Sequence, residues 1–227
     1  MAQIRNKVKI RIVALAVAVM TMTATCAVAD IVGSKHDFSA MGWSEGQVCL
    51  VCHTPHNANQ TVATAPLWNH KITEVTNYTL YDSDSMNQTP GQPGGISKLC
   101  LSCHDGTVAL DSIGTTTGST KVLPGQPGYI GTDLSDDHPV SVTWDHQTIW
   151  PFWTSPKCFA CHDFFAGDGN PEKFRVPFYT YDGGSTYKVE CSSCHDPHNN
   201  GDGTQGPDYM LRTKIDDSYL CLLCHNR

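Results

Sequence analysis

Residues 100–104 read Cys-Leu-Ser-Cys-His, and this pattern of two cysteines separated by two residues and followed at once by histidine begins again at residues 49, 158, 191 and 221. The chain has 227 residues and 11 cysteines, and the five copies use every cysteine except Cys26. A pattern that accounts for nearly all of the cysteines indicates one chemical unit repeated five times.

The spacing within each copy is that of a c-type haem attachment motif, C-x-x-C-H. Two thiols three positions apart lie on one face of a turn and can form thioethers to the two vinyl groups at one porphyrin edge. The histidine that follows then reaches the iron from the proximal side. We therefore expect five haem c groups. The attachment cysteines would be Cys49, Cys52, Cys100, Cys103, Cys158, Cys161, Cys191, Cys194, Cys221 and Cys224, and the proximal iron ligands would be His53, His104, His162, His195 and His225.

Two other uses of paired cysteines fit the sequence less well. A zinc site of two cysteines and two histidines does not require histidine to follow the second cysteine immediately. Redox-active C-x-x-C disulfides usually belong to a thioredoxin-like βαβ pattern, which this sequence does not resemble.

The first 29 residues are typical of a secretory signal peptide. Basic residues 5, 7, 9 and 11 precede an apolar run over residues 12–20, and Ala27-Val28-Ala29 is a small-residue cleavage site. An uncleaved anchor is the alternative, but the apolar run is shorter than the roughly 20 residues that span a bilayer. We expect residues 1–29, including Cys26, to be removed on export. The mature protein would then be periplasmic or extracellular, on the outer surface, and without a transmembrane segment.

Distal iron ligands must come from outside the five motifs. The histidines there are His36, His56, His70, His138, His146 and His198. The only methionines after residue 29 are Met41, Met86 and Met210, which are too few to supply five distal ligands. We therefore expect two histidine ligands on each iron. Without a methionine ligand to raise them, the haem potentials should be low. His56 and His198 each lie three residues after a proximal histidine, an offset that favours ligation of a neighbouring haem.

Several segments resemble exported multihaem c-type cytochromes of the doubled C-x-x-C-H family, similar to outer-surface and filament cytochromes of metal-reducing bacteria. These segments are GSKHDFS (33–39), CLVCHTPHNA (49–58), APLWNH (65–70), LYDS (80–83), KLCLSCHDGTVALDS (98–112), LSDDHPVSVTWD (134–145) and CHDPHN (194–199). The resemblance implies that the distal ligands are His36, His56, His70, His138 and His198, which leaves His146 spare. It also implies possible self-assembly into filaments, with His36 a candidate ligand to a neighbouring subunit.

Length and composition predict one domain over residues 30–227. The chain has 19 glycines and 13 prolines, which favour turns. About 40 residues for each predicted haem are too few for a separate domain around each one. We expect a multihaem cytochrome c fold, mostly coil with short α-helices and minimal β-structure, whose core is built around five covalently attached haems. Helices are expected over residues 96–112 and 218–226, and extended chain over 139–144 and 174–181.

The expected function is electron transfer through five closely packed, bis-histidine haems in extracytoplasmic or extracellular respiration. The partners would be other redox proteins or extracellular electron acceptors, and no residue need be catalytic. A net charge of −7 argues against nucleic-acid binding. The alternative is a multihaem redox enzyme of the nitrite or hydroxylamine type, which needs one haem with an open distal position.

Overall fold

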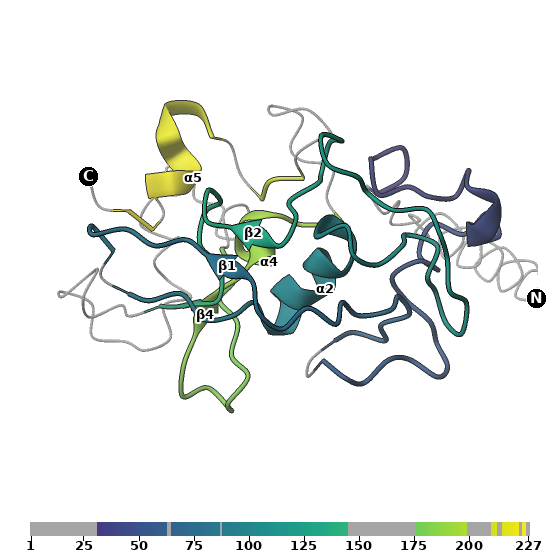
Figure 1. Cartoon of the computed structure of the whole chain (residues 1–227), viewed down its shortest axis with the longest axis horizontal. Helices are drawn as coiled ribbons and strands as arrows, with labels where there is room; N and C mark the ends of the chain where they lie inside the picture. Colours follow the sequence, from purple (N-terminus) through teal and green to yellow (C-terminus); the bar gives the residue numbers. More distant parts are fainter. Residues whose placement is uncertain are drawn as a thin grey trace, which may run out of the picture.

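The computed structural model describes residues 31–62, 65–86, 88–144, 176–198, 210–212, 215–222 and 224–225. The predicted signal peptide, the third motif (158–162) and His146 lie outside these ranges. Within them, long loops connect short helices and two-residue strands, with η1 (Gly42–Ser44) and α5 (Tyr219–Leu222) toward opposite ends of the long axis (Figure 1). No helix in these ranges is long and apolar enough to cross a membrane.

The main helix, α2 (Gly95–His104), carries the second motif. The prediction of a helix over residues 96–112 was right about its start and wrong about its end. Gly106 has φ of +73° and donates its N–H to Cys103 O, a left-handed helix ending that glycine favours. The Asp105 carboxylate takes the next N–H, that of Thr107, at 2.7 Å and so closes the helix.

Two more short helical segments carry motif residues. The helix α4 (Cys191–Cys194) contains the cysteines of the fourth motif. In the fifth motif, η2 (Asp216–Ser218) leads into α5 (Tyr219–Leu222) close to the start predicted for a helix over 218–226.

The strands form two separate pairs. Strand β1 (Thr79–Leu80) runs parallel to β2 (Asp133–Leu134), and β3 (Val142–Thr143) runs antiparallel to β4 (Lys188–Val189). The extended chain expected over 139–144 contains β3, and Tyr179, within the expected 174–181 segment, forms a bridge with Lys188.

Protein atoms alone make a small apolar core. Tyr78, Leu101 and Leu134 form its buried cluster, against which Val75 and Leu80 pack. Many other buried side chains are polar. Most of these are serines or threonines, and His70, Asp105 and Glu190 are the buried side chains with ionisable groups.

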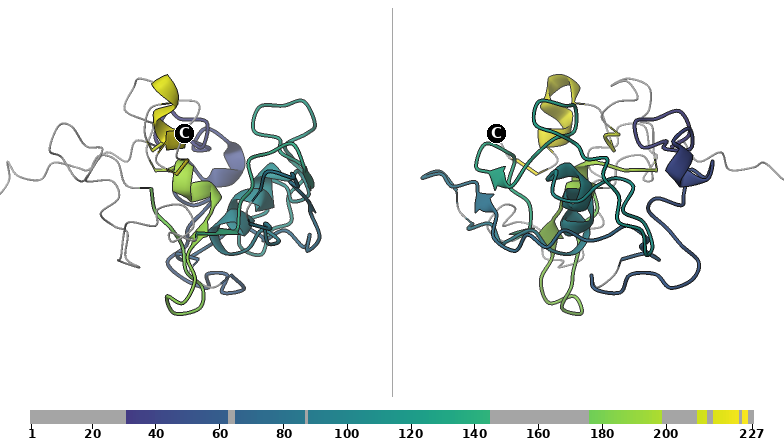
Figure 2. Two further views of the ribbon diagram at one scale, coloured as in Figure 1. Left: turned by 90° about the vertical axis from the view of Figure 1, so that its left-hand side faces the viewer. Right: turned by 45° about the vertical axis from the view of Figure 1, so that its right-hand side comes forward.

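A buried polar contact joins α2 to the segment that leads into α4. The hydroxyl of Ser97 donates to the carboxylate of Glu190 and accepts the backbone N–H of Cys191 at 3.0 Å. Ser141, beside β3, donates to the same carboxylate at 3.0 Å. Both views of Figure 2 show α4 lying against α2. The second and fourth motifs are therefore packed side by side.

Candidate haem-binding centres

Each described motif forms a single helical turn. The backbone N–H of the motif histidine donates to the carbonyl of the first cysteine in the first, fourth and fifth motifs, at 2.8, 3.0 and 2.8 Å. The second motif lies wholly inside α2. This i to i−4 bond places both cysteines of a motif on one face, which is the arrangement that the C-x-x-C-H spacing predicts.

Three of the motif thiols, those of Cys52, Cys103 and Cys224, are in surroundings that disfavour thiolate. Burial raises the pKa of Cys52 to about 11 and that of Cys103 and Cys224 to about 12. None of the eight described cysteines forms a disulfide. Zinc binding and disulfide exchange both use the thiolate, so the surroundings of these three thiols suit those chemistries poorly. No group of three or more His, Cys, Asp or Glu side chains in the described ranges is arranged to hold a metal ion directly.

Three pairs of histidine rings lie close together. The ring centroids are 5.9 Å apart for His53 and His198, 5.9 Å for His36 and His104, and 6.2 Å for His138 and His225. Each pair joins one motif histidine to one histidine outside the motifs, and these three pairs share no histidine. The structure therefore brings three of the five predicted distal ligands to proximal ones.

The separation within the pairs is that of two axial ligands. Imidazole nitrogens bind metals at about 2 Å, so two rings on opposite faces of one metal have centroids about 6 Å apart. A porphyrin supplies the four equatorial nitrogens itself, and a protein then needs to provide only two axial groups.

In three of the six paired histidines, the ring nitrogen Nδ1 is held by a neighbouring backbone carbonyl. That of His53 donates to Pro66 O at 2.6 Å, and that of His104 donates to Gly128 O at 2.5 Å. That of His138 donates to Pro139 O at 3.0 Å. A histidine that binds a metal usually donates its other ring N–H in this way, which leaves Nε2 unprotonated.

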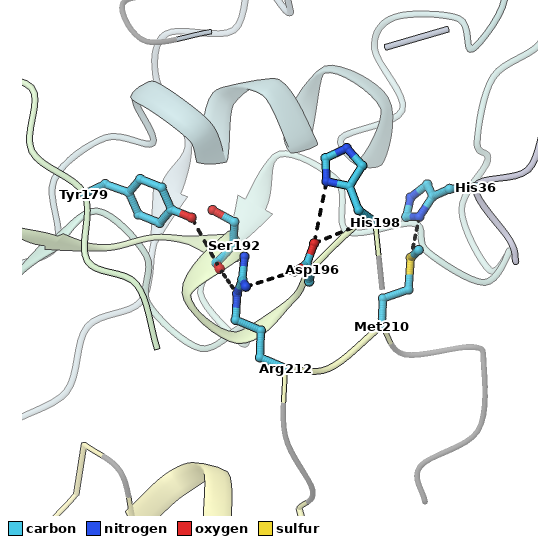
Figure 3. Close-up of polar contacts among 7 residues, drawn as sticks. All are labelled: His36, Tyr179, Ser192, Asp196, His198, Met210 and Arg212. Atoms are coloured by element: carbon cyan, nitrogen blue, oxygen red, sulfur yellow. Dashed lines mark hydrogen bonds and ion pairs between the residues drawn. The ribbon is translucent and has the colours of Figure 1, made fainter. Parts of the chain in front are cut away.

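Two of the other three partners, His36 and His198, are held by side chains from the second half of the chain (Figure 3). His36 Nδ1 lies 2.7 Å from Met210 Sδ. His198 Nδ1 lies 3.7 Å from Asp196 Oδ1, and the same carboxylate is bound by Arg212 at 3.0 Å. Both rings are thus oriented by contacts that do not use Nε2.

The surroundings of His36 keep its ring neutral. Burial, helped by the neighbouring His104 and His195, lowers the pKa of His36 to about 4. An unprotonated imidazole is the form that binds iron, so the folded chain presents this ring in the state that a ligand needs.

His70 is arranged differently from the paired histidines. The ring is buried, and it hydrogen-bonds through Nδ1 to Lys71 O at 2.7 Å and through Nε2 to Ala109 O at 2.9 Å. Its Nε2 also lies 3.6 Å from Cys103 Sγ. His70 therefore sits against the second motif, and its assignment as a distal ligand stays a prediction.

The structure also places two other predicted ligands, His56 and His195. His56 is exposed in a turn where Thr54 Oγ1 donates to its carbonyl. His195 lies in an isolated bridge with Leu211. Cys158, Cys161 and His162 lie outside the described residues.

Backbone carbonyls of Pro66, Gly128 and Pro139 contribute to these sites without any side-chain signal in the sequence. Gly128 closes the second Pro-Gly-Gln-Pro-Gly segment (124–128), which by composition predicts only a turn. The turn is present, since Tyr129 N donates to Gln126 O at 3.1 Å, and it also aims the Gly128 carbonyl at His104.

Interactions between cysteines of different motifs indicate which described motifs are neighbours. The Cys100 thiol hydrogen-bonds to the Cys191 sulfur, which raises the pKa of Cys100 and lowers that of Cys191. Cys52 lies near Cys103 and helps to raise its pKa. In the same way Cys194 helps to raise the pKa of Cys224. The first motif is thus next to the second, the second to the fourth, and the fourth to the fifth.

The residues present fit haem groups at these positions. The indole Nε1 of Trp68 is buried without a hydrogen-bond partner, and its ring centroid lies 6.3 Å from that of His53. A buried donor without a partner is costly and suggests an additional group beside it. The paired imidazoles, the two cysteines on one face of each motif turn and the small protein core also fit haem binding. Models of known protein families and curated protein sequences give no match to this chain.

Proposed function

We propose that this protein transfers electrons through five covalently attached c-type haems with two histidine ligands on each iron. The observation that carries the proposal is the set of three imidazole pairs, each formed by a motif histidine and a distant histidine about 6 Å away. With both axial positions filled by strong protein ligands, the iron has no site for a substrate.

The bound haem supplies reversible one-electron chemistry, and the chain supplies ligands, spacing and a low-polarity environment. Histidine at both positions favours low potentials. The Nδ1 contacts of His53, His104 and His138 with backbone carbonyls hold the rings in one orientation. Rigid ligands reduce the rearrangement that accompanies a change of charge at the site.

The order of neighbouring motifs supports a path through the molecule. We number the haems by motif. The interactions between cysteines of different motifs then support a spatial order of haem 1, haem 2, haem 4 and haem 5. Haem 3 would be attached through Cys158 and Cys161, outside the described residues. An exported protein with such a path would pass electrons between redox proteins or to extracellular acceptors.

The test is a spectroscopic count on the holoprotein, produced in a host with the haem c attachment machinery. Mass spectrometry should give the chain from Asp30 plus five haems, and the oxidised protein should contain only low-spin haem. The His146→Ala variant should keep the same number of low-spin haems, because His146 is the predicted spare histidine. A chain without covalent haem would overturn the proposal. A high-spin ferric haem that binds added small ligands would instead support the enzyme alternative.

A further inference from the structure

We infer that the ring pairs define three axial ligand sets, His53 with His198 on haem 1, His104 with His36 on haem 2, and His225 with His138 on haem 5. This assignment rests on the proposed function and specifies which residue completes which iron. In each set one ring belongs to a C-x-x-C-H motif and the other comes from a distant segment.

The first pairing differs from what neighbourhood in the sequence suggests. His198 follows the fourth motif by three residues, yet its ring lies 5.9 Å from that of His53 in the first motif. The backbone N–H of His198 donates to Asp196 Oδ1 at 3.1 Å, and Arg212 Nη1 contacts the other carboxylate oxygen of Asp196. These contacts fix the position of Asp196 beside His198 (Figure 3).

The second pairing gives His36 a partner within its own chain. The loop that carries His36 is ordered by Asp37, whose carboxylate accepts the N–H of Gly33 at 2.7 Å and that of Ser39 at 3.0 Å. The Nδ1 atom of the His36 ring contacts Met210 Sδ. This intramolecular pairing is the alternative to ligation of a neighbouring subunit's haem by His36.

The third pairing involves His138, which lies in the segment LSDDHPVSVTWD (134–145) that resembles multihaem c-type cytochromes. His138 is oriented through its Nδ1 contact with Pro139 O, and its ring centroid lies 6.2 Å from that of His225. The pairing links the middle of the chain to the last motif.

The pairs differ in the angle between their ring planes. The planes are 18° apart for His53 and His198, 73° for His36 and His104, and 79° for His138 and His225. Two nearly parallel imidazoles interact with the same iron d orbital. They therefore raise its energy above that of the second d orbital of the same type, and this splitting gives a rhombic low-spin signal in electron paramagnetic resonance. Nearly perpendicular imidazoles act on both orbitals alike and give a strongly anisotropic signal with a large maximal g value.

The experiment compares spectra of the oxidised holoprotein with those of His198→Met, His36→Met and His138→Met. Subtracting the His198→Met spectrum from that of the wild type should leave one rhombic signal. The difference spectra for His36→Met and for His138→Met should each contain one signal with a large maximal g value. Methionine keeps the iron six-coordinate and raises the potential, so one midpoint should also rise in each variant.

His56→Met is the matched control, because His56 occupies the same place after the first motif as His198 does after the fourth. Its difference spectrum should not contain the rhombic haem 1 signal. The assignment is overturned if His198→Met removes a signal with a large maximal g value, if it removes none, or if His56→Met removes the rhombic signal of haem 1.

Failure of the pairing is distinguishable from failure of the proposed function. Five low-spin haems with the wrong difference spectra would leave electron transfer intact and refute only the pairing. If His198→Met does not accumulate, His198→Gly prepared with imidazole in the growth medium and buffers supplies the same measurement. Return of the rhombic signal with imidazole supports the pairing, and unchanged spectra with and without imidazole refute it.

Discussion

At the scale of single residues, the carboxylate of Glu190 has an unusual setting. The residue is 1% exposed and receives hydrogen bonds from the hydroxyls of Ser97 and Ser141. Burial raises the pKa of this carboxyl, and the hydrogen bonds oppose the rise without cancelling it. Since desolvation prevails, the folded chain holds a proton on Glu190 more tightly than the unfolded chain does.

A raised pKa predicts how stability depends on pH. The contribution of Glu190 to the free energy of unfolding is fully present below its unfolded pKa, about 4.3, and is lost as the pH rises through its folded pKa. Glu190→Gln removes this titration, so its stability should fall less steeply with rising pH than that of the wild type. Urea unfolding of both proteins at a series of pH values measures the difference. Glu74→Gln, at an exposed position, controls for loss of one charge, and equal slopes for Glu190→Gln and wild type would contradict the prediction.

At the scale of elements, the start of α2 depends on close approach by an aromatic ring. Gly95 has φ of +45°, and a Cβ placed on it would lie 1.8 Å from Tyr181 Cζ. The hydroxyl of Tyr181 accepts the N–H of Ile96 at 2.9 Å and so satisfies a donor in the first turn of α2. Only glycine fits this position, because it has no side chain and tolerates positive φ.

Gly95→Ala should therefore destabilise the protein. The left-handed backbone and the loss of the Tyr181 hydrogen bond together should cost about 2–3 kcal/mol. Gly42→Ala is the matched control, since a Cβ there would meet nothing within 4 Å, and it should change stability by less than about 0.5 kcal/mol. Urea unfolding of the two holoprotein variants gives both values, and equal stability of the two would argue against the account.

Much of this local structure follows from sequence patterns, and the rest depends on contacts across the chain. The motif spacing predicts the helical turns around Cys100 and Cys191. It does not predict where α2 ends, because the contacts of Asp105 and Gly106 override a continuing apolar pattern. Counting histidines indicates that two ligands per iron are available. The partner of His53 depends on a distant fold-back, and the Gly128 carbonyl that orients His104 has no side chain to mark it.

At the scale of the whole molecule, the described part of the chain has a small apolar core and a few contacts between segments that are distant in the sequence. The ring pairs join segments that lie far apart in the sequence, and the apolar cluster around Tyr78, Leu101 and Leu134 is small. Cross-links that close long loops restrict the unfolded chain strongly. In the proposed holoprotein, haem would contribute both the missing apolar surface and these cross-links.

Removing haem should therefore abolish cooperative folding. A chain exported without the attachment machinery should lack a sigmoidal unfolding transition in circular dichroism, whereas the holoprotein should show one. The variant with Cys221 and Cys224 both replaced by alanine should carry four haems and unfold at a lower urea concentration than the wild type. A sharp transition in the haem-free chain, at the same urea concentration as in the holoprotein, would contradict this prediction.

The fold-back of His198 onto His53 has a consequence for the timing of biogenesis. A chain that is exported from its N-terminus delivers His36 before His104, so under the inferred pairing the second centre is complete soon after its motif emerges. The first centre would have to wait for His198, which leaves the translocation channel after about seven-eighths of the 227-residue chain. Its iron therefore stays open on one side through most of secretion, and the earliest motif is among the last to mature.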